Sequence, residues 1–466
     1  MQPINIENNL QNQREKVVKH SKTTLYQTIW RWHFYAGLIF APFLIILAIS
    51  GAVYLFKPEI ESILYKDLYF VDEIQTSTLT PSAQVEKVKE KYPEGIVTSF
   101  KTYDDPSRTT EIGLMNKENM LSVFINPYNG EIYGSLKNEE KFTEIFKKLH
   151  SELIIGGTIA NRIVELAACW GAILIVTGLY IWWPRNKASI WGTLLPRFSK
   201  NGRVFWRDMH AVPAFWLSLF ILLLIATGLP WSGVMGEQIN RLATSTNTGY
   251  PAFAFSWGEK PQSILKTKNV AEDVPWATEN LPVPASETDG YMPISLDDVT
   301  FIAEHENIKK PYTVSMPEGI EGVYTVATSQ TKPWDNATLH IDQYSGSVLS
   351  DVRFKDYGIM AKAITIGIAL HEGRLFGLVN QLIGLIICLG LIGIVVSSLI
   401  MWFKRKPNGK LGSPAKPKDK KITRTVFFIM LAMGTIMPLV GISIIIVFLL
   451  DRFVIAKIKP LKSWIG

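Results

Sequence analysis

Five long apolar segments constrain this chain more than any other feature of its sequence. Each is long enough to cross the roughly 30 Å hydrocarbon layer of a membrane as a helix. Backbone polar groups find no partners in lipid, so a segment that spans it has to satisfy them internally, as a helix does. The sequence therefore predicts an α-helical integral membrane protein. The expected transmembrane helices cover residues 28–56, 158–184, 209–231, 371–403 and 425–451.

Lysine and arginine are concentrated on one side of an alternating arrangement of these helices. Short loops that carry these residues remain in the cytoplasm. The net charge of +7 is therefore explained by membrane topology, and nucleic acid is not needed as a partner. The predicted cytoplasmic parts are the tail 1–27 and the basic loops 185–208 and 404–424. The predicted periplasmic parts are the two long segments 57–157 and 232–370.

The fifth segment disagrees with this pattern. If it crosses the membrane once, the tail 452–466 lies outside, although it carries Arg452 and three lysines. Gly434 and Pro438 lie within the segment, and proline in particular interrupts or kinks a helix. The sequence leaves the topology of this segment and of the tail open.

The chain also repeats itself. The first and third apolar segments align on His33 and His210, which places Ser50-Gly51 against Thr227-Gly228, with 18 residues from histidine to glycine in both. LHSELIIGG precedes the second segment and LHEGRLFG the fourth. The stretches SVFINPYNGEIYG and TLHIDQYSGSVLS each read as strand, turn and strand, the signature of a β-hairpin. We predict two parallel repeats of helix, outer α+β domain and helix, followed by a fifth helix.

Four of the seven histidines lie at the ends of the repeated helices. His33 and His210 belong to the inner side, and His150 and His371 to the outer side. Ionisable groups at this depth are costly and usually line an interior site. Two imidazoles from facing helices can bind the iron of a b-type haem from its two sides. The sequence therefore predicts two haems b per chain, with His33/His210 and His150/His371 as the metal ligands.

Glycines and arginines near these histidines fit the same hypothesis. Gly51 lies five helical turns from His33 on the same face, roughly 27 Å away, and Gly228 is related in the same way to His210. Glycine allows a flat macrocycle to approach a helix closely. Three arginines lie within three residues of a histidine and are candidate partners of the haem propionates. They are Arg31, Arg207 and Arg374.

Other interpretations of these residues remain open. An interfacial histidine can be an anchor or a core hydrogen-bonding group, glycine can serve helix packing, and arginine can snorkel or mark the inner side. Zinc is the rival metal, but no Cys, Asp or Glu completes a tetrahedral set beside either pair. Arg162 and Glu165 lie one turn apart and are expected to pair with each other, or to handle protons. His20, His305 and His340 are expected to be solvated.

The motifs WRWHFYAGL with ISGAVY, DMHAVPAFW with ATGLPW, LHSEL, LHEG and the two hairpins resemble those of the PepSY-associated transmembrane helix family. That family includes iron-regulated inner-membrane proteins and ferric-siderophore reductases, and the resemblance spans about residues 25–455. It implies PepSY-like outer domains and, by motif, the same four histidines as ligands of two haems. Some relatives carry a fused flavin reductase domain, whereas this sequence has no GxGxxG fingerprint. A separate cytoplasmic reductase or a membrane quinol is therefore the expected electron donor.

The expected function is a haem-dependent ferric-siderophore reductase of the bacterial inner membrane. It would pass electrons to a periplasmic acceptor and release Fe²⁺, and its partners would be membrane lipid, the acceptor and the donor. No catalytic side chain is expected, since the cofactor carries the chemistry. Two rivals remain: a transport component for a siderophore or iron chelate, and a non-catalytic, membrane-anchored PepSY binding or inhibitory module.

Overall fold

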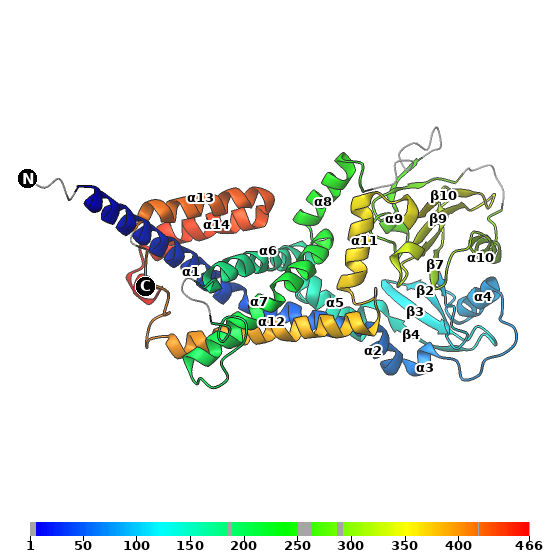
Figure 1. Ribbon diagram of the computed structural model, residues 1–466. Coiled ribbons are helices and arrows are strands. Elements are labelled where there is room, and N and C mark those ends of the chain that lie inside the picture. Colours follow the sequence, from blue (N-terminus) through cyan, green and yellow to red (C-terminus); the bar gives the residue numbers. More distant parts are fainter. Residues whose placement is uncertain (1–5, 185–188, 250–261, 287–291, 418, 466) are drawn as a thin grey trace, which may run out of the picture. The chain divides into compact units, whose positions relative to one another are not determined.

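The computed structural model describes residues 6–184, 189–249, 262–286, 292–417 and 419–465 (Figure 1). The chain divides into two compact units. The helical unit comprises Met1–Ala52, Lys148–Glu237 and Leu385–Gly466, and the sheet unit comprises Val53–Lys147 and Gln238–Gly384.

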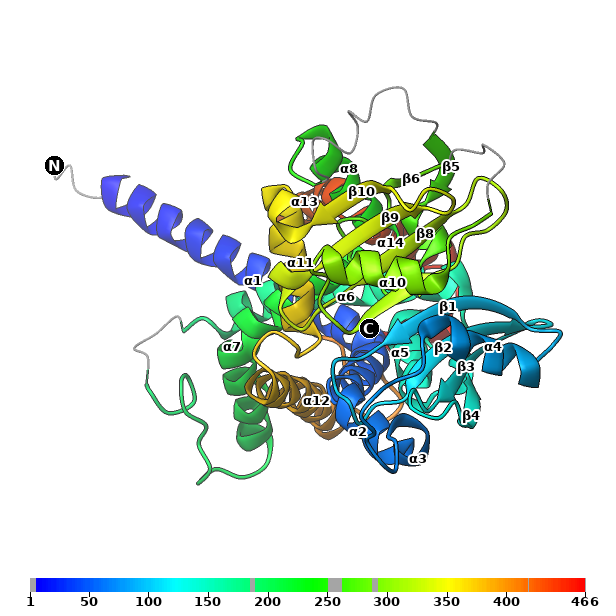
Figure 2. The same cartoon turned by 90° about the vertical axis from the view of Figure 1, so that its right-hand side faces the viewer.

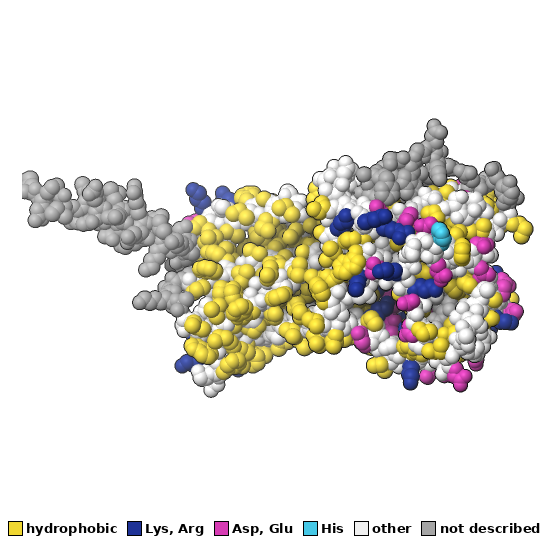
Figure 3. Space-filling view, turned by 45° about the vertical axis from the view of Figure 1, so that its right-hand side comes forward, with side chains coloured by type: hydrophobic (Ala, Val, Ile, Leu, Met, Phe, Trp, Pro, Cys, Tyr) yellow, Lys and Arg dark blue, Asp and Glu magenta, His cyan; other side chains and the backbone are white. Residues whose placement is uncertain are grey.

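Five helices within the described residues are long and apolar enough to span a membrane, so this is a multi-pass membrane protein. Large apolar side chains on these helices are exposed, for example Leu219 at 72 %, as lipid-facing positions are. Figure 3 shows such side chains gathered over the helices, with the charged ones over the sheet unit. The candidate spans are Leu25–Tyr54, Gly157–Trp182, Arg203–Trp231, Leu378–Arg405 and Pro438–Ile455. The helices that contain them are α1 (Ile6–Tyr54), α6 (Gly157–Trp182), α7 (Arg203–Gly228), α12 (Leu378–Arg405) and α14 (Pro438–Leu450).

The expected fourth span begins seven residues later than predicted, at Leu378, whereas the second begins at Gly157, within one residue of the prediction. Glycines interrupt the chain before both. His150 lies in a separate helix, α5 (Phe142–Glu152), and His371 ends another, α11 (Ile359–His371). Before α6, Gly156 and Gly157 have φ of 78° and 81°. Before α12, Gly373 and Gly377 have φ of 76° and 58°. Glycine adopts this left-handed conformation without a steric cost, so these positions end one helix and start the next.

The segment predicted as a single fifth helix is two helices. α13 (Lys420–Ile436) ends before Met437, and α14 begins at Pro438, which has no N–H to continue the preceding helix. The two helices pack side by side (Figure 1). A Cβ on Gly434 would lie 2.4 Å from the Cα of Gly441, so only glycine permits this approach. Further along the pair, the ring centres of Phe427 and Phe448 are 5.3 Å apart.

This helical hairpin returns the chain to the side on which it began. The C-terminal helix α15 (Lys459–Ile465) contacts the loop between α12 and α13: the Leu411 N–H donates to the Trp464 carbonyl at 2.8 Å, and the Ser413 hydroxyl to the Ile465 carbonyl at 2.7 Å. The tail therefore lies on the same side as the basic loop 404–424, a point that the sequence left open. The basic tail joins the other basic segments, which removes the conflict with the positive-inside pattern.

We predict that a cysteine introduced at Ser463 is labelled by an impermeant thiol reagent from the same membrane side as one at Asn408, because the hairpin brings both there. The measurement is labelling of intact and of inverted vesicles in a background without Cys169 and Cys388, both of which are buried. Lys117→Cys, in the turn between β2 (Thr110–Asn116) and β3 (Asn119–Ile125), is the opposite-side control. Labelling of Ser463→Cys together with Lys117→Cys would contradict the hairpin topology.

The two long outer segments combine into one antiparallel sheet of eight strands in the order β10-β9-β8-β7-β1-β2-β3-β4. They were expected as two separate domains, but β1 pairs with β7 and joins them. Both predicted hairpins are confirmed, with β3 pairing with β4 and β9 with β10. The first segment supplies β1 (Ile96–Thr102), β2 (Thr110–Asn116), β3 (Asn119–Ile125) and β4 (Ile132–Lys137). The second supplies β7 (Tyr312–Ser315), β8 (Val323–Thr328), β9 (Ala337–Asp342) and β10 (Val348–Arg353).

One face of this sheet is apolar and packs against two helices (Figure 2). Val88 of α4 (Pro81–Lys91) and Val299 of α10 (Leu296–His305) are fully buried in this core together with Ile112 and Leu339 of the sheet. Because side chains alternate along each strand, the residues between these apolar ones lie on the other face of the sheet. The remaining elements are α2 (Lys57–Leu64), α3 (Lys66–Tyr69), α8 (Val234–Ser245), α9 (Thr267–Val270), β5 (Gln262–Lys266) and β6 (Pro282–Pro284).

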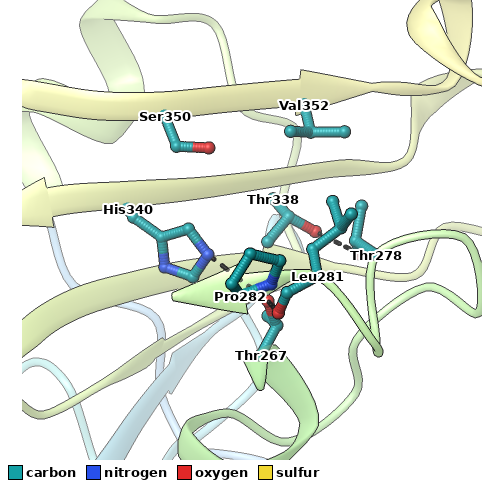
Figure 4. Close-up of a pocket in the computed structure, with 8 residues that line it drawn as sticks. All are labelled: Thr267, Thr278, Leu281, Pro282, Thr338, His340, Ser350 and Val352. Atoms are coloured by element: carbon teal, nitrogen blue, oxygen red, sulfur yellow. Dashed lines mark hydrogen bonds between the residues drawn. The ribbon is translucent and has the colours of Figure 1, made fainter. Parts of the chain in front are cut away.

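The other face carries small polar residues and His340, which borders a small cavity (Figure 4). His340 was expected to be solvated, and this is wrong: only 3 % of it is exposed. Its Nδ1 lies 3.0 Å from the Thr325 hydroxyl, and its Nε2 3.5 Å from that of Thr267. Burial lowers the pKa of His340 to about 4 from 6.5. His305 is solvated as expected, with 76 % of its side chain exposed, and the side chain of His20 lies outside the described residues.

We predict that acid weakens the sheet unit through His340. The unfolded chain takes up a proton on this residue as the pH falls through 6.5, but the folded protein only near 4, so the free energy of unfolding falls across that window. The loss between pH 7 and 4.5 should be roughly 2–3 kcal/mol, measured by denaturant unfolding of the detergent-solubilised protein. His340→Gln should remove this pH-dependent part, whereas His305→Gln should retain it. Equal pH dependence in all three proteins would contradict the assignment.

Candidate functional site

Two imidazoles meet inside the helical unit. The ring centres of His33 on α1 and His210 on α7 are 6.4 Å apart, and their planes are inclined at 77°. Two imidazoles that bind one metal from opposite sides through bonds of about 2 Å have ring centres roughly 6 to 6.5 Å apart. The structure thus brings these two side chains together as predicted, at a spacing that fits a single iron. That they bind it remains a prediction.

Each of these rings is fixed by a hydrogen bond at Nδ1. His33 Nδ1 lies 2.9 Å from the Thr177 hydroxyl, which donates its own proton to the Ile173 carbonyl at 2.7 Å and therefore accepts from the histidine. His210 Nδ1 lies 2.9 Å from the Ile394 carbonyl, which can only accept. Nδ1 therefore carries the proton in both rings, and Nε2 carries the lone pair. Metal-binding histidines are held by hydrogen bonds of this kind, which fix the tautomer and the ring orientation.

His150 is held in the same way near the other end of α1. Its Nδ1 lies 3.0 Å from the Ser50 hydroxyl and 3.1 Å from the Leu47 carbonyl. Ser50 donates its own proton to the Ile46 carbonyl at 2.7 Å, so here too Nδ1 is the donor and Nε2 has the lone pair. Ser50 follows His33 by 17 residues of helix, which places the two histidine sites roughly 25 Å apart along α1.

A glycine beside each hydroxyl lets the imidazole lie against the helix. A Cβ on Gly178, next to Thr177, would be 3.1 Å from Cε1 of His33, and one on Gly51, next to Ser50, 3.3 Å from Cε1 of His150. Gly51 was expected to make room for a macrocycle, whereas the group that lies over it is the ring of His150. Gly228 is the last residue of α7, and its expected role remains a prediction.

The family model of the PepSY-associated TM region matches residues 30–405. This match covers most of the chain and all four histidines. The chain belongs to the PepSY-associated TM region family. No curated protein matches it.

In this PepSY-associated membrane protein, His371 is the last residue of α11 and belongs to the sheet unit, whereas His150 belongs to the helical unit. The side chain of His371 is partly buried. The pairing of these two residues remains a prediction.

The three arginines chosen as propionate partners already have partners of their own. Arg207 pairs with Asp208 at 2.7 Å, and Arg374 with Glu372 at 2.5 Å. Both guanidinium groups therefore have a carboxylate partner within the chain, and their role as propionate partners remains a prediction. Arg31 donates to neutral oxygens, the Pro414 carbonyl and the Tyr35 hydroxyl.

Glu165 pairs with Arg162 as expected, at 3.9 Å, and has further partners that were not expected. Its two oxygens accept the backbone N–H groups of Val234 and Met235, both at 2.8 Å. These are the first residues of α8, so the carboxylate, only 2 % exposed, neutralises the positive end of that helix. This is a structural role, and it does not require proton transfer.

Sequence reasoning missed the groups that hold the histidines. Thr177-Gly178 lies in the stretch TGLYIWW, and Ser50-Gly51 in ISGAVY. The hydroxyl–glycine pair was visible as a motif, but its partner was not, because the histidine that each hydroxyl contacts is 100 residues away for Ser50 and 144 for Thr177. The Ile394 carbonyl had no signal at all, since every residue has one.

Proposed function

We propose that this protein is a membrane oxidoreductase with two b-type haems, each held by two histidines, that passes electrons from one side of the bilayer to the other. The observation that carries the proposal is the His33–His210 pair, with ring centres 6.4 Å apart. Both rings present the nitrogen that a metal needs. Ionisable side chains within an apolar helical bundle are costly, and for this reason they usually mark a functional site.

The residues of the chain have distinct roles in this proposal. His33 and His210 are the ligands of the inner haem, and His150 and His371 those of the outer haem. Thr177 and the Ile394 carbonyl orient the first pair, and Ser50 orients His150. Bound between such ligands, haem supplies reversible one-electron chemistry between Fe³⁺ and Fe²⁺. The apolar side chains of the bundle keep water from these sites.

The way the rings are held also supports the two parallel repeats, which are part of the proposal. His150 Nδ1 contacts the Leu47 carbonyl and the hydroxyl of Ser50, three residues later. His33 Nδ1 contacts the hydroxyl of Thr177, which is itself 3.2 Å from the Leu174 carbonyl, three residues earlier. His210 bonds the Ile394 carbonyl, which also accepts from Ser397, three residues later. The same local device thus recurs on α1, α6 and α12.

The electron acceptor we propose is the ferric iron of a siderophore on the periplasmic side, as the family resemblance implies. Each electron taken from a separate reductase or a quinol converts one Fe³⁺ to Fe²⁺. Oxygen ligands hold Fe²⁺ less strongly than Fe³⁺, so the iron is released. In this proposal the donor and the acceptor lie on opposite sides of the membrane. Two haems at the two histidine sites, roughly 25 Å apart along α1, would carry the electron between those sides.

The first test is the visible spectrum of the purified protein, expressed with an adequate haem supply. We expect a Soret band, sharp α and β bands on reduction, and about two haems per chain. His33→Ala and His210→Ala should lose the same haem, and His150→Ala and His371→Ala the other. A colourless protein would refute the proposal, and loss of different haems within one pair would refute that pairing.

The second test addresses the groups that hold the rings. Thr177→Val removes an acceptor of the His33 Nδ1 proton, which makes the imidazole a weaker donor to iron. We expect the midpoint potential of the inner haem to rise and that of the outer haem to stay constant. In Ser50→Ala we expect the midpoint potential of the outer haem to rise and that of the inner haem to stay constant. Gly393→Ala is the matched control, because its Cβ would have nothing within 4 Å. Equal shifts of both haems in either variant would count against the assigned sites.

A further inference from the structure

Arg405 is a cation beside the inner histidine pair that has no anionic partner. It is the last residue of α12, and its guanidinium carbon lies 5.5 Å from the ring centre of Trp30 and 5.0 Å from that of Phe34. These rings flank His33 on α1, three residues before it and one after it. The cation is therefore held against the turn of α1 that carries His33.

The hydrogen-bonding capacity of Arg405 is only partly used. One Nη donates to the Gly412 carbonyl at 2.7 Å, whereas the buried Nε has no partner among the described residues. No carboxylate of the described chain pairs with it, and the charge that acts on it is that of Arg203, another cation. An unpaired guanidinium near a like charge is unfavourable, so the site lacks an anion.

The neighbouring cations have other surroundings. Arg197 and Arg207 share one carboxylate, that of Asp208, at 2.7 Å each, and Arg31 donates to the Pro414 carbonyl and the Tyr35 hydroxyl. Lys404, the residue before Arg405, is exposed and accessible to water and lipid headgroups. Arg405 differs from these because its buried Nε has no partner among the described residues.

We propose that Arg405 binds a carboxylate of the cofactor held by His33 and His210, namely a haem propionate. This inference rests on the proposed function. The planar guanidinium fork matches a carboxylate, with two parallel N–H···O bonds. Lipid phosphate has related chemistry, but it would meet exposed cations such as Lys404 before a cation enclosed by Trp30 and Phe34.

The test compares Arg405→Gln, Arg405→Lys and the control Lys404→Gln in nanodiscs of phosphatidylcholine alone and of phosphatidylcholine with an anionic lipid. The readouts are haem content and the midpoint potential of the inner haem, identified as the band that His33→Ala loses. Arg405→Gln leaves a propionate unpaired, which favours the ferric form. We expect its reduction equilibrium to shift about tenfold toward Fe³⁺, which is about 59 mV for one electron. Arg405→Lys should retain most of the potential, and Lys404→Gln all of it.

The outer haem serves as the internal control of folding, because its band should be unchanged in every variant. Two bound haems with the same inner potential in Arg405→Gln and Lys404→Gln would overturn this inference and leave the proposed function intact. A shift that appears only with anionic lipid would assign Arg405 to the headgroup of an anionic lipid and would also overturn it. A protein without haem would overturn both.

Discussion

Every histidine that enters the helical unit has to find an acceptor for its Nδ1 proton, and this requirement organises the bundle. An imidazole in an apolar environment is costly unless it is hydrogen-bonded. His33 on α1 bonds Thr177 on α6, and His150, just before α6, bonds Ser50 on α1. Each of these two helices therefore holds the histidine associated with the other. A shift of one helix against the other would break both hydrogen bonds, so the two sites fix the packing of α1 on α6 as much as the packing fixes the sites.

The sheet unit depends on a comparable link between distant parts of the chain. β1 of the first outer segment pairs with β7 of the second, and Lys101 on β1 forms an ion pair with Asp273 at 2.6 Å. Glu111 on β2 lies near the same lysine. Its burial alone would raise its pKa, but Lys141 and Lys101 outweigh burial and hold the pKa at about 2. The two segments are therefore halves of one structure, and neither would bury its edge strand or its charges alone.

The helical hairpin of α13 and α14 shows how a few residues can override hydropathy. The segment has the apolar character of one long span, yet Pro438 ends hydrogen bonding from the preceding turn, and Gly434 and Gly441 let the two helices touch. Charge then agrees with geometry, because the basic C-terminal tail meets the basic loop before α13. Hydropathy measures only how apolar a segment is, and it does not predict whether the chain reverses its direction within that segment.

The sequence by itself determined the class of the protein, four of its spans, both β-hairpins and the family to which it belongs. These follow from local patterns: apolar length, residue alternation with turn residues, and motifs within a few positions of each other. It also selected His33 and His210 as a pair, because the repeat relates them. The tertiary structure alone decided what holds the histidines, that the outer segments form one sheet, that His340 is buried and that the chain turns back at Met437. These depend on contacts between residues far apart in the chain, such as Thr177 with His33 or Leu411 with Trp464, for which a single sequence carries no local signal.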